Sequence, residues 1–241
     1  MDKATYTLLE NYMLSSMADS AHDKEHVYRV LYTALEIAKA EKEVDYDILI
    51  GACLLHDTGR REQLEDPALC HALVGGDKAY AFLTAQGFPE EYAAQVRQCI
   101  RTHRFRRNDP PQSLEAKILF DADKLDVAGA MGIARTLVYK GTVSDPLYRL
   151  GPDGQVSDGT GDTQSSFFQE YKYKLENLYS RFYTQAGAKM AEKRRPAAVA
   201  FYESLLEEVR SAYKNGTEAL SSVLDSSASL SERLSSQSQL P

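Results

Sequence analysis

Residues 54–60 read Leu54-Leu55-His56-Asp57-Thr58-Gly59-Arg60, an apolar run that ends abruptly in a histidine beside an aspartate. Burying an imidazole and a carboxylate at the end of an apolar segment is costly unless another group compensates them. A divalent metal ion is the obvious compensator, because histidine nitrogen and aspartate oxygen are both ligands of first-row metals. The stretch therefore predicts a buried metal site, provided that other ligand-type residues converge on it.

The composition is that of an ordinary folded protein. The chain has 241 residues, 43% of them hydrophobic and 26% charged, which suits one large domain or one domain plus a tail. Its net charge of −7 argues against stable binding to nucleic acid or to an anionic membrane. Residues 1–20 lack the features of a signal peptide, and the three cysteines show no C-x-x-C spacing. We therefore expect a cytoplasmic protein with reduced thiols, and the composition leaves a homo-oligomer open.

Apolar residues recur at helical spacing along most of the chain, which predicts an all-α, single-domain helical bundle. The turn signal Pro152-Asp153-Gly154 suggests one small β-hairpin near 147–158. After residue 215 the chain becomes Ser-rich, so we expect a domain over 1–215 and a floppy tail or marginal helix over 216–241. The predicted helices cover residues 3–18, 23–42, 45–57, 72–86, 90–107, 113–139, 167–188 and 191–213.

All five histidines fall in the first 103 residues, each near an end of a predicted helix. Helix ends can converge in a bundle, and such folds build metal sites between facing helices. Five histidines so placed make coincidence the weaker explanation, although His22 is as readily a surface residue as a ligand. The five are His22, His26, His56, His71 and His103.

Three acids, Asp121, Asp123 and Asp126, interrupt an otherwise apolar helical segment. At about 100° per residue, Asp123 and Asp126 lie about 60° apart around the helix, whereas Asp121 points well away from Asp123. Solvation does not explain three acids among core-like neighbours. We therefore expect at least one of them to be functional.

The order His26, His56-Asp57, Asp123 resembles the signature of the HD-domain metal-dependent phosphohydrolases. The stretch HDKEHVYRVLYTALEIA resembles the first-histidine helix, ACLLHD the paired motif, and ADKLD the last-aspartate helix. The segment GAMGIAR and the later segment 167–178 resemble a bacterial branch related to nucleotide pyrophosphohydrolases. The resemblance covers most of residues 20–210, and it implies an α-helical enzyme that acts on phosphate esters or anhydrides, often nucleotides.

The resemblance implies four metal ligands, His26, His56, Asp57 and Asp123. Two or three histidines in a ligand set favour Mn, Fe, Co or Ni over Mg, which prefers oxygen. One ion is favoured and two are possible. In two-metal members, histidines at the places of His71 and His103 complete a second site that Asp57 bridges. In one-metal members, such residues can instead face the phosphates of the substrate.

Charged residues near these ligands are candidates for the remaining roles. Many relatives carry a catalytic acid shortly after the His-Asp pair. Here Glu62, which follows the pair, or Asp126 could fill that role, and both join Asp57 as candidate catalytic residues. Arg60 and Arg61 either neutralise an anionic substrate or complement a helix dipole, and Arg106 and Arg107 extend a similar cluster. The residues expected to bind substrate are His71, His103, Lys124, Arg29 and Arg104.

These residues together predict a metal-dependent phosphohydrolase in which the ion activates water for attack on phosphorus. The expected substrate is a small phosphorylated molecule, and a nucleotide in particular. Two alternatives stay open. The set with His71 and His103 also resembles HD-fold di-iron oxygenases, and an HD fold without catalysis could bind a nucleotide as a sensor.

Overall fold

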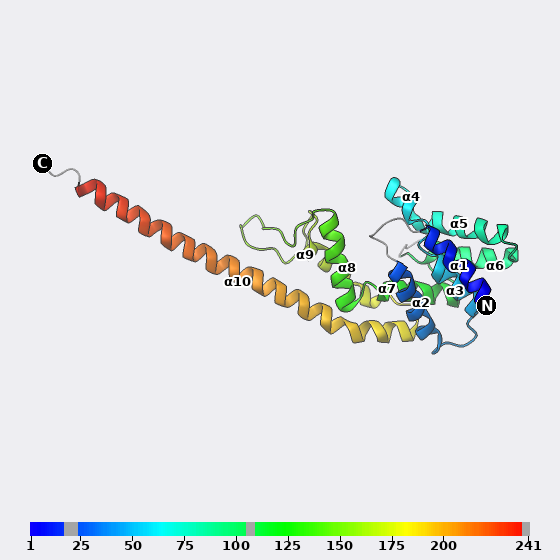
Figure 1. Ribbon diagram of the computed structural model, residues 1–241. Helices are drawn as coiled ribbons and strands as arrows, with labels where there is room; N and C mark the ends of the chain where they lie inside the picture. Colours follow the sequence, from blue (N-terminus) through cyan, green and yellow to red (C-terminus); the bar gives the residue numbers. More distant parts are fainter. Residues whose placement is uncertain (17–23, 105–108, 238–241) are drawn as a thin grey trace.

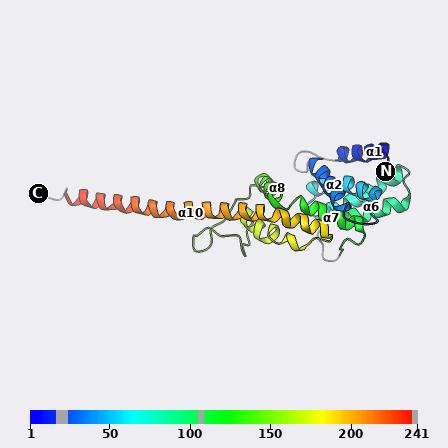
Figure 2. The same cartoon turned by 90° about the horizontal axis from the view of Figure 1, so that it is seen from below.

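The computed structural model describes residues 1–16, 24–104 and 109–237, with only the backbone described over 226–237. The fold is all-α, as predicted. Helices α1 to α7 gather at one end of the molecule, and α10 runs away from them toward the C terminus (Figures 1 and 2). In chain order the helices are α1 (Lys3–Ser16), α2 (Lys24–Ala38), α3 (Tyr46–Leu55), α4 (Arg60–Glu65), α5 (His71–Ala85), α6 (Glu90–Thr102), α7 (Leu114–Leu125), α8 (Gly129–Thr142), α9 (Phe167–Glu170) and α10 (Gln185–Gln237).

Helix α3 is the central helix because its residues are apolar on nearly every side. Every residue from Gly51 to Leu55 is buried, and α2, α6 and α7 pack around it. Asp45 sets its beginning, since the side chain accepts hydrogen bonds from the backbone N–H groups of Asp47 and Ile48 at 2.9 and 3.1 Å. The C-terminal end of α3 therefore delivers the residues that follow it into the interior.

The segment predicted as one helix over 113–139 is two helices, α7 and α8. The break falls at Gly129, which has a positive φ of 66°. A Cβ atom there would lie 2.7 Å from the Cβ of Arg194 and 2.9 Å from its carbonyl oxygen, so only glycine lets α8 begin this close to α10. The helical spacing of the apolar residues continues across Gly129, so the sequence pattern did not reveal the break.

The β-hairpin predicted near 147–158 is reduced to a short pairing without strands, in which the backbone N–H groups of Gly151 and Ser157 donate to Gln155 O and Arg149 O at 2.8 and 2.9 Å. The described residues of this loop hold one isolated bridge, between Leu150 and Val156. Side chains of α10 donate to two carbonyl groups of this loop: Arg210 to Val156 O at 3.1 and 3.2 Å, and Tyr202 to Asp158 O at 2.5 Å. The loop is therefore held on α10 rather than extended into a ladder.

The two helices predicted over 167–188 and 191–213 are also arranged differently. The short helix α9 leads into a π-helical turn, η1 (Tyr171–Leu175), and a 3₁₀ turn, η2 (Leu178–Ser180), before α10 begins. The stacked rings of Tyr171 and Tyr202, 3.9 Å apart, fix η1 on α10. Helix α10 continues past residue 215 to Gln237. Among the described helices, none combines the length and apolar character needed to cross a bilayer.

Candidate metal centre

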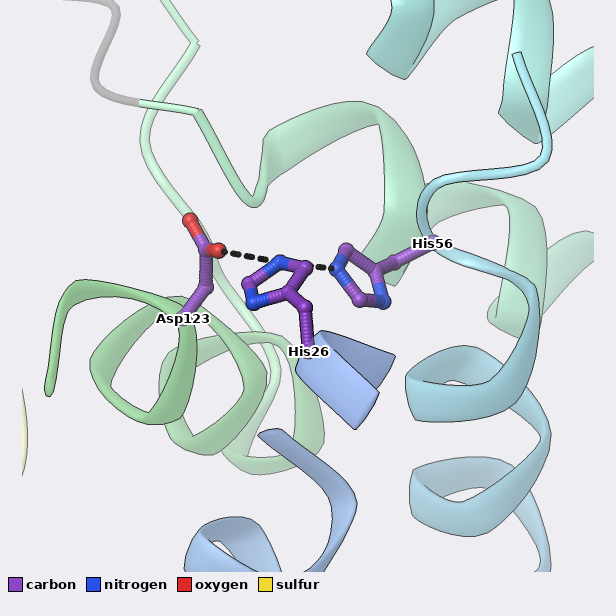
Figure 3. Close-up of side chains that lie close together, drawn as sticks. All are labelled: His26, His56 and Asp123. Carbon is purple, nitrogen blue, oxygen red and sulfur yellow. Dashed lines mark hydrogen bonds and ion pairs between the residues drawn. The ribbon is translucent and has the colours of Figure 1, made fainter. Parts of the chain in front are cut away.

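Four side chains meet where α2, α3 and α7 converge. His26 lies in the first turn of α2, Asp123 in the last turn of α7, and His56 and Asp57 directly follow α3. Nε2 of His26 lies 3.4 Å from Nε2 of His56 and 3.5 Å from Oδ1 of Asp123 (Figure 3). Oδ2 of Asp57 lies 3.5 Å from Nε2 of His26 and 3.7 Å from Nε2 of His56. The structure thus brings together the four residues predicted as metal ligands.

The other oxygen of Asp57 faces a second group, formed with His71 and His103. Oδ1 lies 3.6 Å from Nε2 of His71 and 4.0 Å from Nε2 of His103. The two Nε2 atoms are 3.3 Å apart. All three side chains are buried. Asp57 therefore presents one oxygen to each group, which is the arrangement expected of a residue that could bridge two ions.

A close backbone approach brings the end of α3 to the start of α5. A Cβ atom at Gly59 would lie 2.4 Å from the carbonyl oxygen of His71 and 2.5 Å from the backbone nitrogen of Gly75. No other residue fits in this space without moving one of the two backbones. Because Asp57 and His71 lie on either side of this contact, the glycine sets the separation of their side chains.

Each of the four histidines turns Nδ1 toward an acceptor and Nε2 toward the centre of the site. A neutral ring whose Nδ1 donates a hydrogen bond carries its lone pair on Nε2, and that is the form in which histidine binds a metal. The fold therefore prepares four ring nitrogens for ligation. The acceptors are Oδ2 of Asp126 for His26 (2.7 Å), the carbonyl of Cys53 for His56 (2.7 Å), Oε1 of Gln63 for His71 (2.7 Å) and the carbonyl of Ile100 for His103 (2.6 Å).

The histidines differ in charge. Burial lowers the pKa of His56, and it lowers the pKa of His71 to about 2 and that of His103 to about 3. Burial also acts against the charge on His26, but hydrogen bonds to Asp123 and Asp126 outweigh it and raise the pKa of His26 to about 9. Three rings are therefore neutral at pH 7, and His26 carries a proton that an arriving cation would have to displace.

The carboxylate of Asp57 gives the clearest indication of a cation. Its Oδ2 is buried and has no hydrogen-bond donor in the described part of the chain, a costly state for an ionised oxygen. Burial opposes the charge, yet the positive charges of Arg60 and of protonated His26 hold the pKa of Asp57 well below its usual range. Atoms that bind one ion at about 2.0–2.2 Å lie about 3.0–3.6 Å apart, close to the 3.4 to 3.7 Å seen among the first group. Two nitrogens and two oxygens so placed fit a first-row divalent ion.

Basic side chains border the ligands on the side that reaches solvent. Nζ of Lys124 donates to Oδ2 of Asp123 at 3.0 Å, and Nε of Arg60 donates to Oδ1 of Asp57 at 2.9 Å. Both side chains are about a quarter exposed or less. Nη1 of Arg104 lies 3.7 Å from Sγ of Cys70, the residue before His71. Lys124 and Arg60 are therefore close enough to neutralise an anion that approaches the ligands.

Asp126 and Arg29, expected in catalysis and in substrate binding, are bound to each other behind His26. Arg29 donates from Nε to Oδ1 of Asp126 at 2.7 Å and from Nη2 to Oδ2 at 3.1 Å. Arg135 also donates to Oδ2 of Asp126, and its Nη1 lies 2.8 Å from Nδ1 of His26. Sequence reasoning missed Arg135, although it closes the GAMGIAR segment, because one continuous helix would have carried it away from the site.

The remaining predicted residues lie elsewhere. Glu62 is ion-paired with Lys78 at 2.6 Å and belongs to neither ligand group of the described residues. Asp121 is fully buried and accepts hydrogen bonds from the backbone N–H groups of Tyr183 and Thr184 at 2.7 to 3.2 Å, so it caps the start of α10. Its role is structural. The described residues do not include His22, Arg106 and Arg107.

Comparison with known proteins matches the region that holds both ligand groups. The sequence model of the HD domain matches residues 24–128. The chain is also 31% identical to the YpgQ protein of Bacillus subtilis (strain 168) over 195 residues, which are 79% of this chain and 85% of YpgQ. This chain belongs to the HD domain family. The family resemblance predicted from the sequence is confirmed.

Solved structures agree with the fold of this HD-domain protein. The crystal structure of a predicted HD superfamily hydrolase from an uncultured Thermotogales bacterium is 32% identical with a TM-score of 0.56, covering 83% of this chain and 90% of that one. The crystal structure of Bacillus subtilis YpgQ in complex with ADP is 27% identical with a TM-score of 0.64, covering 85% of this chain and 97% of that one.

Proposed function

We propose that this HD-domain protein is a metal-dependent phosphohydrolase that cleaves a phosphate ester or anhydride of a nucleotide. One observation carries the proposal. Oδ2 of Asp57 is a buried, ionised oxygen without a hydrogen-bond donor in the described chain, and it faces Nε2 of both His26 and His56. We assign the activity to residues 1–215 as the HD-type domain and propose that residues 216–241 are an appended tail.

The residues that would hold the ion are His26, His56, Asp57 and Asp123. Their two imidazoles favour Mn, Fe, Co or Ni over Mg. When bound, such an ion supplies Lewis-acid polarisation of a phosphoryl oxygen and a water of lowered pKa. The two carboxylates of the set balance the two positive charges of a divalent ion once His26 has lost its Nε2 proton.

The chain's own basic residues would neutralise the substrate. Lys124 and Arg60 each bond to a ligand carboxylate at about 3 Å and each remain partly exposed, so they can also meet phosphoryl oxygens beside the ion. We propose Arg104 as a third contact for a longer phosphate chain. Arg29 would act only through Asp126, because its guanidinium is bound to that carboxylate on the far side of His26.

A relative supports the nucleotide. The YpgQ structure, 27% identical to this chain, is a complex with ADP. A nucleoside polyphosphate carries several negative charges, which the basic side chains at the open side of the site would compensate. We therefore propose a nucleoside di- or triphosphate rather than a phosphate monoester, which carries fewer charges.

A metal and nucleotide screen tests the proposal. The protein is stripped of metal, reloaded separately with Mn²⁺, Co²⁺, Ni²⁺ or Mg²⁺, and incubated with nucleoside mono-, di- and triphosphates. We expect release of phosphate or pyrophosphate that requires the added ion and is strongest with Mn²⁺, Co²⁺ or Ni²⁺. Binding of metal and nucleotide without release of phosphate or pyrophosphate would contradict the proposed phosphohydrolase and would support a non-catalytic nucleotide sensor.

The second ligand group supports a second candidate, a two-ion site. In the neutral rings of His71 and His103, Nε2 is an acceptor, so both can bind an ion or orient a water; they bind a phosphate oxygen only when protonated. Arg60 favours a single ion, because it already donates to Oδ1 of Asp57 at 2.9 Å. Titration with Mn²⁺ counts the ions directly. The di-iron oxygenase would be supported instead if protein purified without oxygen contained two irons, released no phosphate, and turned over only when oxygen was added.

A further inference from the structure

Asp126 connects a metal-site histidine to two arginines. The residue follows the last turn of α7 and is almost fully buried. Its Oδ2 lies 2.7 Å from Nδ1 of His26, while Arg29 and Arg135 both donate to the same carboxylate. Both oxygens are thus engaged on the Nδ1 side of the ring. The Nε2 side faces Asp57 and Asp123.

We propose that Asp126 is a positioning residue for the metal site, which keeps Nδ1 of His26 as a donor so that Nε2 is the atom that binds the ion. Arg29 and Arg135 hold the carboxylate in place and compensate its charge. The proposal rests on the metal site of the proposed function. It replaces the role of catalytic acid or base expected for Asp126, because the carboxylate lies behind the ring and is enclosed by the two guanidinium groups.

His26 is the histidine of the site whose acceptor is an anion. Carbonyl groups hold His56 and His103, and an amide oxygen holds His71. A carboxylate partner orients a ligand imidazole and raises its basicity, and loss of such a partner typically weakens metal binding by about 10- to 100-fold. Of the four rings, His26 therefore depends most on its partner.

Arg135 makes the carboxylate necessary. Its Nη1 lies 2.8 Å from Nδ1 of His26, and a guanidinium can only donate. Without the charge of Asp126, Arg135 is the nearest partner of Nδ1 and would donate to it. The ring would then carry its proton on Nε2, where the ion has to bind. Asp126 and Arg135 thus favour opposite tautomers of His26.

The test compares two matched variants on α7 by titrating the metal-free protein with Co²⁺, followed by visible absorbance and by calorimetry. Asp126→Asn should bind Co²⁺ about 10- to 100-fold more weakly than the natural chain. Asp121→Asn makes the same change at a buried acid of the same helix that bonds only to the start of α10. It should lower the melting temperature but leave Co²⁺ affinity within about threefold.

A double variant shows whether Asp126→Asn loses Co²⁺ affinity through the tautomer of His26 or through damage to the fold. If Asp126→Asn fails because Arg135 then donates to Nδ1, the variant Asp126→Asn with Arg135→Gln should recover part of the lost Co²⁺ affinity. Three results would each overturn the proposal. The double variant could lose as much Co²⁺ affinity as the two single variants together. Asp126→Asn could bind Co²⁺ as tightly as the natural chain, or Asp121→Asn could lose as much affinity as Asp126→Asn.

A measurement on the unchanged chain avoids any variant that does not fold. Nitrogen-15 spectra of the histidine rings in the Zn²⁺-loaded protein should place the proton of His26 on Nδ1 and the ion on Nε2. The reverse assignment would overturn the role of Asp126. A natural chain that binds neither Co²⁺ nor Zn²⁺ would instead refute the metal site itself, so the two failures are distinguishable.

Discussion

Oδ1 of Asp57 lies 3.6 Å from Nε2 of His71, so a single carboxylate joins the two histidine groups of the site. Its other oxygen, Oδ2, lies 3.5 Å from Nε2 of His26. The Asp57 side chain therefore belongs to every candidate ligand set, whether one ion binds or two. Loss of Asp57 should affect both groups at once.

Asp57→Ala should abolish retention of metal and lower phosphate release by more than about 100-fold. This exceeds the loss typical of a residue that only hydrogen-bonds to a metal ligand. The reason is that the substitution removes a shared negative charge from a buried cluster. Metal content after dialysis and product release are measured on the same samples. Asp77→Ala is the control, because Asp77 pairs with Arg97 at 2.7 Å on the surface and is half exposed. Undiminished turnover in Asp57→Ala would remove the basis of the proposed function.

Gly59→Ala should destabilise the protein by about 1–3 kcal/mol, the usual cost of overpacking. The added methyl group would lie 2.4 Å from the carbonyl oxygen of His71 and would push α5 away from the end of α3. Binding at the group of Asp57, His71 and His103 should weaken as well. Denaturant unfolding and metal titration measure the two effects.

A glycine in open space provides the matched control for that substitution. A Cβ atom at Gly141 of α8 would meet nothing within 4 Å. Alanine has the better helix propensity, so Gly141→Ala should leave stability unchanged or raise it by up to about 1 kcal/mol. If both variants unfold at the same denaturant concentration, the close approach at Gly59 does not constrain the site.

Asp121→Ala should lower the free energy of unfolding by about 2 kcal/mol without weakening metal binding. The substitution leaves the backbone N–H groups of Tyr183 and Thr184, of which that of Thr184 is buried, without their acceptor at the start of α10. Thermal unfolding should show a melting temperature lower by about 4–8 °C. A loss of metal affinity as large as that of Asp126→Asn would instead give Asp121 a part in the site.

The sequence was sufficient for the features that depend on local pattern. Helical periodicity placed His56 and Asp57 at the end of a central helix and His26 near the start of another. It placed Asp123 within one long helix over 113–139, and only the structure ends that helix at Leu125, two residues beyond Asp123. It was not sufficient where packing between distant segments decides. The break at Gly129 depends on contact with Arg194 of α10, so the return of Arg135 to His26 could not be predicted from periodicity.

Two further residues show the same limit. Asp121 resembles a candidate ligand in the sequence because its neighbours are apolar. Only its contact with Tyr183, 62 residues later and just before α10, reveals that it is a cap. Gln63 orients His71 from the short helix α4, which was not predicted. Six residues are too few for a clear helical period, so the sequence offered no signal for this contact.

Metal affinity should rise with pH up to about 9 and then level off. In the metal-free protein the pKa of His26 is raised from 6.5 to about 9, so its protonated form stabilises the fold fully below pH 6.5, and this contribution is lost as the pH rises through 9. An ion must displace the Nε2 proton, which costs affinity by about tenfold for each pH unit below 9. The neutral rings of His56, His71 and His103 add nothing to this slope at neutral pH.

Calorimetric titration with Mn²⁺ in buffers of different ionisation enthalpy measures both the affinity and the protons released. We expect close to one proton per ion at pH 7.5 and almost none at pH 10. Asp121→Asn should show the same slope, because the residue caps α10 and does not contact His26. An affinity that stays constant between pH 7 and 9 would contradict the displacement of a proton from Nε2 of His26 by the ion.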